Sequence, residues 1–327
     1  MNNKSKIDHF YLVDGSGYIF RAYYALPPLS RKSDGLPTGA VNGFCKMLFD
    51  LLEEVRSDDS KNKPTHFAIV FDSARKNFRN DIYPDYKANR SEAPEDLIPQ
   101  FDYIRKSVDA FNLPSIEMLN YEADDLLATY AEKIIKDGHK VTIISSDKDL
   151  MQLVRPGIRL YDPIKNKEIG LNEVKEKFGV KPNQVIDVQS LAGDSSDNVP
   201  GVPGIGIKTA SELINQYNNL ENLLKNVEKI KQNKRRQTLT ENQDKAILSK
   251  KLVTLDNNVP IKISLESLKI KNIVQEKLYS FLREMEFNRL LSQAIAYYGE
   301  PNKDKTNITK PNSQIDRKKY VQIKEIK

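Results

Sequence analysis

The alternation of apolar and polar positions divides the chain into short strands and amphipathic helices. Apolar runs of strand length occupy residues 9–14 ("HFYLVD"), 65–72 ("THFAIVFD") and 140–147 ("KVTIISSD"). Between them, residues 39–55 and 122–135 carry apolar residues at helical spacing. In the second of these helices five apolar side chains share one face: Leu126, Leu127, Tyr130, Ala131 and Ile134. Strands that alternate with helices predict an α/β domain with a mostly parallel central sheet and flanking helices.

The pattern changes along the chain and predicts a division into regions. We expect an α/β core over residues 1–180 and a smaller, α-helical region over residues 181–299. Residues 228–245 are basic and polar, which predicts a connection within that helical region. Residues 300–327 are poor in apolar side chains, so we expect a disordered linker or the start of a missing domain.

Each of the three predicted strands runs into an aspartate. These aspartates are Asp14, Asp72 and Asp147. One such residue is explained equally well as a turn that ends a strand. In open parallel sheets, however, ligands bind outside the carboxyl ends of the strands, so the three acids are expected to converge.

Six further acids lie in short groups along the chain: Glu122, Asp124, Asp125, Asp149, Asp194 and Asp197. Taken singly, the acids in "YEADDLL" are explained by the dipole of a helix start, and those in "SSDKDL" by a turn and a cap. Taken together, nine acids in one place would repel one another by several kcal/mol unless cations or raised pKa values relieve the repulsion.

Magnesium is the cation that this set of acids favours. Mg²⁺ prefers hard oxygen ligands in octahedral geometry. Two such ions about 3.5–4 Å apart activate a water and stabilise the leaving oxygen of a phosphodiester. Nine carboxylates exceed the direct ligands that two ions need, so some must hold the waters around the ions. We therefore predict two or more Mg²⁺ ions, with Mn²⁺ as a substitute.

The stretch "GDSSDNVPGVPGIGIKTA" joins two of these acids to a loop suited to phosphate. Gly204 and Gly206 form a tight turn before a predicted helix start near Ile207, where free backbone N–H groups favour a phosphate, and Lys208 adds positive charge. The arrangement resembles a helix–hairpin–helix motif, which grips the DNA backbone without reading bases.

Composition excludes several other classes of protein. Apolar residues make up 39% of the chain, and no apolar run approaches the ~20 residues that span a membrane. The N-terminus lacks the apolar core of a signal peptide, so we expect a cytoplasmic protein without a membrane partner. Cys45 is the only cysteine and lies in an apolar stretch, which indicates core packing and excludes an intrachain disulfide.

The net charge of +6 becomes informative when it is divided along the chain. Residues 301–327 carry eight Lys/Arg and three Asp/Glu, which leaves about +1 for residues 1–300. If the nine acids bind cations, the remaining residues of 1–300 carry about +10. A basic surface around an acidic pocket is suited to cutting phosphodiesters.

Six segments together resemble a known family. "LVDGSGYIFRAYYA", "VFDSARKNFR", "YKANR", "YEADDLLA", "SSDKDLMQLV" and "LAGDSSDNVPGVPGIGIKTA" are similar to the 5′-nuclease (5′-3′ exonuclease) domain of bacterial DNA polymerase I, which belongs to the flap endonuclease family. The match runs in order from about Phe10 to Gly299. All nine positions of that family's acidic site are carboxylates here, which argues against a non-catalytic relative.

The resemblance implies roles for individual residues. Residues of about 73–100 would form a helical arch through which a single-stranded 5′ end passes, with Lys87 and Arg90 as its catalytic cations. The metal site would comprise the nine acids: Asp14, Asp72, Glu122, Asp124, Asp125, Asp147, Asp149, Asp194 and Asp197. DNA would be bound by a further set: Phe20, Arg79, Gly204, Gly206, Lys208 and Thr209. The family's hairpin also binds a monovalent cation, which implies a K⁺ site at the Gly204–Gly206 turn.

The function implied is a structure-specific 5′-3′ exonuclease and flap endonuclease. Its partners would be DNA with 5′ flaps, nicks or recessed 5′ ends and RNA–DNA primer junctions, with polymerase domains in the same or another chain. Two alternatives stay open. One is a non-catalytic branched-DNA binding module; the other is a toprim-like Mg²⁺-dependent phosphoryl-transfer enzyme, in which Asp14, Asp72 and the hairpin would lack a role.

Overall fold

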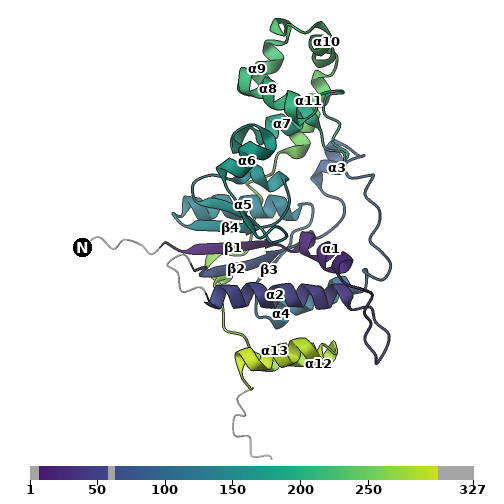
Figure 1. Cartoon of the computed structure of the whole chain (residues 1–327), viewed down its shortest axis with the longest axis vertical. Helices are drawn as coiled ribbons and strands as arrows, with labels where there is room; N and C mark the ends of the chain where they lie inside the picture. Colours follow the sequence, from purple (N-terminus) through teal and green to yellow (C-terminus); the bar gives the residue numbers. More distant parts are fainter. Residues whose placement is uncertain (1–6, 58–62, 301–327) are drawn as a thin grey trace, which may run out of the picture.

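A six-stranded sheet lies at the centre of the protein, in a computed structural model that describes residues 7–57 and 63–300 (Figure 1). Its strand order is β3-β2-β1-β4-β5-β6, and all neighbouring strands are parallel except β5 and β6. The strands are β1 His9–Asp14, β2 His66–Val70, β3 Ser115–Ile116, β4 Lys140–Ile144, β5 Ile158–Asp162 and β6 Lys167–Ile169. The predicted α/β fold with a mostly parallel sheet is confirmed.

The three predicted strands are the middle of this sheet. In chain order they correspond to β1, β2 and β4. In the sheet β1 lies between β2 and β4, with Asp14 opposite Val70 and Val13 opposite Ile144. The chain order reverses between β1 and β4, the place where open α/β sheets bind ligands. The carboxyl ends of all three strands therefore meet at one edge.

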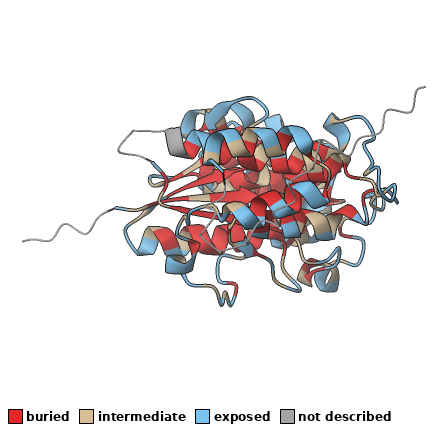
Figure 2. Cartoon of the chain, turned by 90° about the horizontal axis from the view of Figure 1, so that it is seen from below, coloured by how far each residue is buried: buried red, intermediate tan, exposed pale blue. Residues whose placement is uncertain are grey.

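Helices cover both faces of the sheet, because successive side chains of a strand point to opposite sides (Figures 1 and 2). Phe10 and Leu12 of β1 pack into the core beneath α5, whereas Val13 packs into the core on the other side. The helices of the α/β part are α1 Gly15–Ala25, α2 Gly39–Ser57, α3 Phe78–Ile82, α4 Gln100–Ala110 and α5 Ala123–Lys136. Both predicted helices are confirmed as α2 and α5, and all five expected side chains of α5 are buried.

A tower of helices rises above the α5 face (Figure 1). Its helices are α6 Leu171–Phe178, α7 Val185–Ala192, α8 Ile207–Tyr217, α9 Leu220–Lys225, α10 Asn233–Glu241 and α11 Gln243–Val253. The prediction of a plain connection over 228–245 is wrong at its centre, where α10 forms. This helix buries only Leu239, so its apolar pattern is too weak to be read from the sequence.

The last two helices lie on the opposite side of the sheet from this tower (Figure 1). These are α12 Gln275–Glu284 and α13 Asn288–Tyr298, which pack with α2 and α4. This placement differs from the expected single helical region over 181–299. Leu278, Phe281 and Leu282 complete the core of that far face, and helical spacing alone does not tell which face a helix covers.

The segment from residue 73 to 100 contains one short helix in place of a helical arch. Within it only α3 is regular, and turns follow as far as α4. Pro84, Pro94 and Pro99 interrupt any longer helix, since proline lacks an N–H and clashes with the preceding turn. The segment is anchored by Tyr86 and Leu97, which are buried.

Over the described parts of the chain, no helix combines the length and apolarity needed to cross a bilayer. The linker predicted from residue 300 onward lies, beyond Glu300, outside the described residues.

Candidate active site

Asp14 ends β1 and caps the helix that follows it. One carboxylate oxygen accepts the Gly17 N–H at 2.9 Å, and the other accepts the Ser145 hydroxyl at 2.8 Å. A Cβ at residue 17 would lie 2.7 Å from that second oxygen, so glycine is required there. The backbone therefore fixes Asp14 at the carboxyl edge of the sheet.

Asp72 and Asp147 are oriented at the same edge by neighbouring backbone. The Asp72 Oδ1 atom accepts the N–H of Ala123, the first residue of α5, at 2.8 Å. The Asp147 Oδ1 atom accepts the N–H of Asp149 at 2.8 Å. Ser145 accepts the Asp147 N–H at 3.0 Å while it donates to Asp14, so one serine orients two strand-end acids.

The electrostatics of three acids show that like charges crowd this edge. Burial, reinforced by Asp72 and Asp147, raises the pKa of Asp14 to about 6. Burial and the Asp147 carboxylate raise the pKa of Asp149 to about 7. Burial followed by the charges of Asp147 and Asp14 raises the pKa of Asp124 well above its usual value. The sheet edge thus gathers acids whose repulsion a cation would relieve.

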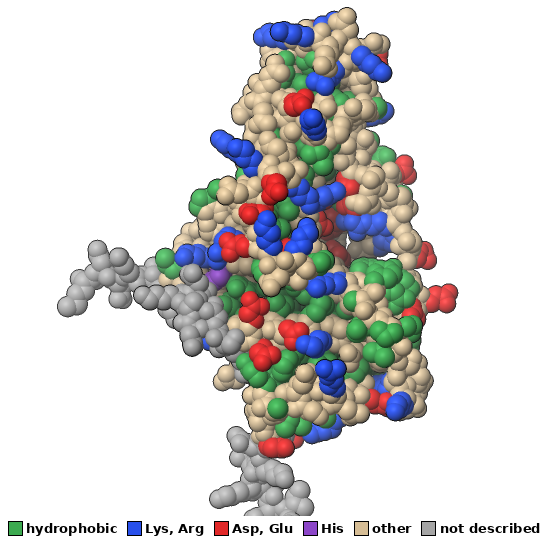
Figure 3. Space-filling view, viewed as in Figure 1, with side chains coloured by type: hydrophobic (Ala, Val, Ile, Leu, Met, Phe, Trp, Pro, Cys, Tyr) green, Lys and Arg blue, Asp and Glu red, His purple; other side chains and the backbone are tan. Residues whose placement is uncertain are grey.

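Cationic residues of the segment after α3 face this acidic edge. Lys87 pairs with Glu122 and lies 3.6 Å from Asp197, and Arg90 also pairs with Asp197. Although burial opposes it, the charge of Glu122 raises the pKa of Lys87, so its ammonium is kept charged. In Figure 3, Asp/Glu and Lys/Arg side chains lie next to each other in the hollow between the tower and the sheet.

A second group of contacts surrounds the acids that begin the tower. Lys148 Nζ lies 2.6 Å from Asp194 Oδ2. The Gln189 amide of α7 donates to Asp149 Oδ1 at 2.5 Å. Asp194 also accepts the N–H and the hydroxyl of Ser196, at 2.9 and 2.6 Å. These contacts bring the tower's first turns onto the acids that follow β4.

Two predicted site residues, Asp125 and Arg79, pair with each other in the interior, and Arg79 Nη1 also lies 3.4 Å from Glu122 Oε2. Both oxygens of Asp125 accept from Arg79, at 2.7 and 2.8 Å, and the two side chains are 0% and 1% exposed. DNA cannot reach a guanidinium so buried, which corrects the predicted phosphate contact of Arg79. Asp125 likewise lacks a free oxygen for a metal, because its carboxylate is engaged by the arginine.

The predicted hairpin immediately precedes α8, which begins at Ile207. Gly204 has a φ of +74°, a conformation that glycine adopts readily. Gly206 has an ordinary φ of −90°, and a Cβ there would meet no atom within 4 Å. Neither steric contact nor backbone conformation therefore requires glycine at residue 206. Lys208 is exposed and Thr209 half-buried beside this turn.

An open cavity of about 650 Å³ adjoins the acids beneath the segment of residues 73–100. Phe20, 43% exposed, lies in its wall together with Phe71 and Phe101. Lys87 and Arg90 line the same cavity, as do the acids Asp72 and Glu122. The cavity thus places an apolar surface and positive charge next to the acidic edge.

The acids have the oxygen donors that a divalent metal prefers, but their present arrangement does not form a metal site. Among the described residues, no three His, Cys, Asp or Glu side chains stand in an arrangement that could hold one ion. Lys87, Arg90 and Lys148 pair with the acids instead. The hard oxygen donors nevertheless match what Mg²⁺ requires, and a bound cation would relieve the like-charge repulsion that helps to raise these carboxyl pKa values.

Sequence reasoning missed four residues that orient the acids: Asn77, Tyr86, Ser145 and Gln189. Asn77 donates to Glu122 at 3.0 Å, and the Tyr86 hydroxyl donates to it at 3.2 Å. Tyr86 and Asn77 lie in or beside quoted motifs, whereas the signal for Gln189 was a polar residue within the apolar run "VIDVQSLA".

Comparison with family models gives two adjoining matches. Residues 9–179 match the 5′-3′ exonuclease N-terminal resolvase-like domain, and residues 180–276 match the 5′-3′ exonuclease C-terminal SAM fold. Together these matches include the sheet, the acids and the hairpin.

Two relatives have clearly similar sequences. The DNA polymerase I of Rhizobium leguminosarum is 54% identical over 285 residues, which are 87% of this chain and 28% of the relative. The 5′-3′ exonuclease of Aquifex aeolicus is 40% identical over 283 residues, 86% of this chain and 94% of the relative. The chain thus spans about a third or less of the polymerase relatives and nearly all of the exonuclease.

One solved structure has the same fold at lower identity. It is a bacteriophage T5 flap endonuclease in a pseudo-enzyme-product complex with DNA and metal ions, with a TM-score of 0.62. It is 21% identical, and the alignment covers 85% of this chain and 98% of that one. At this identity the likeness shows the fold alone.

Proposed function

Because the chain belongs to the 5′-3′ exonuclease family, we propose that it is a Mg²⁺-dependent, structure-specific 5′ nuclease that hydrolyses DNA phosphodiesters. The family membership confirms the resemblance read from the sequence. It does not favour the two alternatives, a non-catalytic binding module and a toprim-like enzyme. The observation that carries the proposal is the gathering of acids from three strand ends, α5 and the tower opposite Lys87 and Arg90.

Eight of the nine predicted acids are retained in the proposed metal site. These are Asp14, Asp72, Glu122, Asp124, Asp147, Asp149, Asp194 and Asp197. When bound, two divalent ions supply an activated water and positive charge at the scissile phosphate. Ser145 and Gln189 orient Asp14 and Asp149, whereas Glu122, Asp194 and Asp197 would exchange their lysine and arginine partners for the ions.

Lys87 and Arg90 are proposed to bind the scissile phosphate. Both lie at the boundary between the acids and the cavity, so their cationic groups can leave the carboxylates for a phosphate that approaches along the same surface. Fixed cations beside the phosphate stabilise the charge that develops in the transition state.

The cavity and the hairpin suit the two parts of a flapped substrate. Exposed Phe20 and the neighbouring aromatic side chains offer stacking surfaces to the bases of a single-stranded 5′ end. The N-terminus of α8, with Gly206 and Lys208, would grip the backbone of the duplex without reading its sequence. A K⁺ ion at the Gly204–Gly206 turn remains part of this proposal. We therefore propose recognition of 5′ flaps, nicks and recessed 5′ ends by shape.

The biological role proposed is removal of RNA primers and displaced flaps during replication and repair. Polymerase domains would act with the nuclease, in the same or another chain, as the name of the Rhizobium relative suggests. A nuclease that acts on bacterial chromosomal DNA would work in the cytoplasm.

Cleavage of a 5′-labelled flap duplex tests this function. With Mg²⁺ the wild-type protein is expected to cut near the junction, and EDTA should abolish the cut. Asp147→Asn should reduce the single-turnover rate at least about 100-fold, since it removes a charged ligand at the centre of the site. Tight binding of the flap with no cleavage under Mg²⁺ or Mn²⁺ would instead support the binding module.

A further inference from the structure

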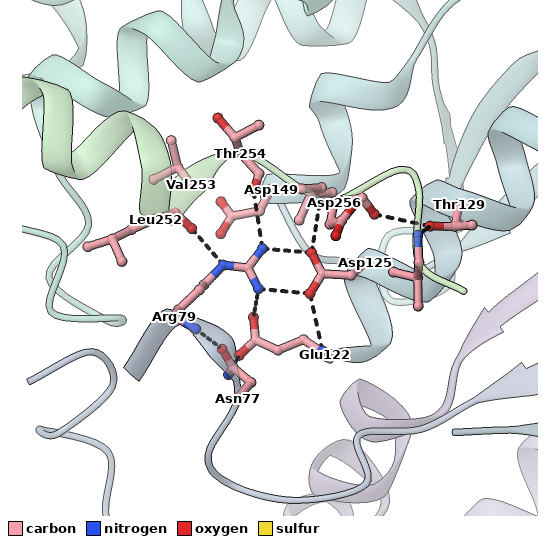
Figure 4. Close-up of polar contacts among 12 residues, drawn as sticks. Asn77, Arg79, Glu122, Asp125, Thr129, Asp149, Leu252, Val253, Thr254 and Asp256 are labelled. Carbon is pink, nitrogen blue, oxygen red and sulfur yellow. Dashed lines mark hydrogen bonds and ion pairs between the residues drawn. The ribbon is translucent and has the colours of Figure 1, made fainter. Parts of the chain in front are cut away.

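Arg79 lies where three segments of the chain meet (Figure 4). It belongs to α3, at the start of the segment that carries Lys87. Its Nη atoms donate to the two oxygens of Asp125 on α5, and its Nε atom donates to the Leu252 carbonyl at 2.8 Å. Nη2 also lies 3.2 Å from the Thr254 carbonyl, at the end of α11. One side chain therefore joins α3, α5 and α11.

Asp125 completes the joint from the side of α5. Beside its two bonds to Arg79, it accepts the backbone N–H of Glu122 at 3.2 Å and that of Asp256 at 2.9 Å. The pair is excluded from water, and the ring of Phe78 lies over the guanidinium at 4.6 Å. A buried, bidentate pair whose remaining groups are satisfied fixes geometry strongly, because any displacement leaves a charge unpaired.

This joint contacts the acids directly, because Arg79 Nη1 lies 3.4 Å from Glu122 Oε2, and further contacts lead from it to the same acid and to Lys87 (Figure 4). The Asn77 side chain accepts the Arg79 N–H at 2.8 Å and donates to Glu122 at 3.0 Å. Asn80 donates to the carbonyl of Tyr86, whose hydroxyl donates to Glu122. The Lys87 N–H then donates to the Asp197 carbonyl at 2.9 Å. The position of α3 thus sets where Glu122 and Lys87 lie.

We propose that Arg79 and Asp125 act as a buried clamp that positions Glu122 and Lys87 for the reaction, by fixing α3 and the end of α11 on the start of α5. They are positioning residues and touch neither metal nor DNA. This inference rests on the proposed nuclease function for its catalytic consequence. Its structural consequence, the order of residues 80–90, is independent of that function.

Two variants loosen the clamp in different ways. Asp125→Asn keeps the shape of the carboxylate but removes its charge, and Arg79→Lys keeps the charge but removes the two-pronged geometry. Asp187→Asn is the matched control, because Asp187 is also a buried acid that pairs with a cation of α11, Lys250, at 2.7 Å. That pair joins α7 to α11 and does not touch α5.

Three measurements separate positioning from the other roles. Amide hydrogen exchange reports the order of Tyr83, Tyr86 and Lys87, whose N–H groups are hydrogen-bonded. Mn²⁺ affinity by electron paramagnetic resonance reports the metal site. Single-turnover cleavage and flap affinity, the latter measured in EDTA, report chemistry and binding separately.

In both clamp variants we expect exchange at those three amides to quicken at least about tenfold relative to Asp187→Asn, at matched global stability. Cleavage should slow about 10–100-fold, because small displacements of catalytic groups are costly. Flap affinity should stay within about threefold of wild type, and Mn²⁺ affinity should fall less than about tenfold, because Glu122 is one of several acids in the proposed metal site. If Asp125→Asn fails to fold, Arg79→Lys decides alone.

Three results would overturn the clamp. A tenfold or greater loss of Mn²⁺ affinity with unchanged exchange would make Asp125 a metal ligand. A loss of flap affinity with unchanged exchange in Arg79→Lys would make Arg79 a phosphate contact. Exchange no faster than in Asp187→Asn would reduce the pair to a stabilising contact. If the wild type cleaves no flap, the nuclease proposal fails, while the exchange measurement still decides on the clamp.

Discussion

Asp124 shows, for a single residue, that a group placed for metal binding can lower the stability of the metal-free fold. Its carboxyl is half-buried in the first turn of α5, and its pKa is raised first by burial and then by Asp147 and Asp14. Burying a charge beside like charges costs free energy that a bound cation would return. In the absence of metal, the native carboxylate should therefore destabilise the fold.

We predict that Asp124→Asn stabilises the metal-free protein, because the amide avoids the like-charge repulsion. The thermal midpoint in EDTA should rise by about 2 °C, the shift that about 1 kcal/mol produces in a chain of this size. The further rise on adding Mg²⁺ should be smaller than in the wild type. Scanning calorimetry with and without Mg²⁺ measures both.

Asp244→Asn is the control for this prediction, since Asp244 is an exposed acid in the first turn of α11. It should gain no stability. A lower midpoint for Asp124→Asn in EDTA would show that the acids do not strain the metal-free fold.

At the scale of elements, the segment of residues 73–100 contributes its cations without being a long helix. Proline prevents continuous helix, so buried anchors such as Tyr86 hold the segment over the acids in place of backbone periodicity. Lys87 itself adopts a positive φ of 57°, which is uncommon for a residue with a Cβ. The Lys87 N–H bond to Asp197 accompanies this conformation and keeps the side chain beside Glu122.

Lys87→Ala should slow single-turnover cleavage about 100-fold, since it removes a fixed cation from the developing charge. Flap affinity should fall much less, because many other contacts bind the duplex. Rapid-quench measurements at saturating enzyme give the rate. Lys76→Ala, an exposed lysine of the same segment, should leave the rate unchanged. Equal effects of the two changes would mean that only the overall charge of the segment matters.

The hairpin before α8 is the second element whose proposed role, binding the duplex backbone, can be tested. Residue 206 has an ordinary φ and open space around it, so Gly206→Ala should lower the thermal midpoint by only about 2 °C, the cost of alanine at a helix N-cap. The added methyl group would obstruct a phosphate at the helix start, so duplex affinity should fall about fivefold or more. Fluorescence anisotropy with a blunt duplex measures the affinity, and unchanged binding would place the duplex elsewhere.

For the whole molecule, the two faces of the sheet have different roles. The α5 face carries the tower and the acids at its edge, whereas α12 and α13 only complete the core beneath α2 and α4 (Figure 1). Substitutions in that lower core should therefore change stability without changing chemistry.

Leu278→Ala tests this separation. Leu278 is fully buried, so its truncation should lower the free energy of unfolding by about 2–5 kcal/mol, as for other core leucines. Urea denaturation measures the loss. Single-turnover cleavage well below the melting temperature should stay within about twofold of wild type, and a large fall in rate would show that the lower core communicates with the site.

The sequence alone determined several strands and helices of this protein and its family, because these follow from local patterns and short motifs. Strand periodicity predicted β1, β2 and β4, and helical spacing predicted α2 and α5. Asp14, Asp72 and Asp147 were expected to converge because parallel strands end at the same edge, and the structure brings them there. The family followed from short motifs whose residues and order are specific.

Only tertiary structure decided matters that depend on contacts between distant segments. Arg79 and Asp125 are 46 residues apart, and no spacing rule distinguishes their buried pair from a phosphate contact and a metal ligand. The position of α12 and α13 beneath the sheet depends on which core has room for their apolar faces. The local sequence pattern determines which helices and strands form and which side chains can bind a metal or a phosphate. Long-range packing and burial determine which of those side chains come into contact.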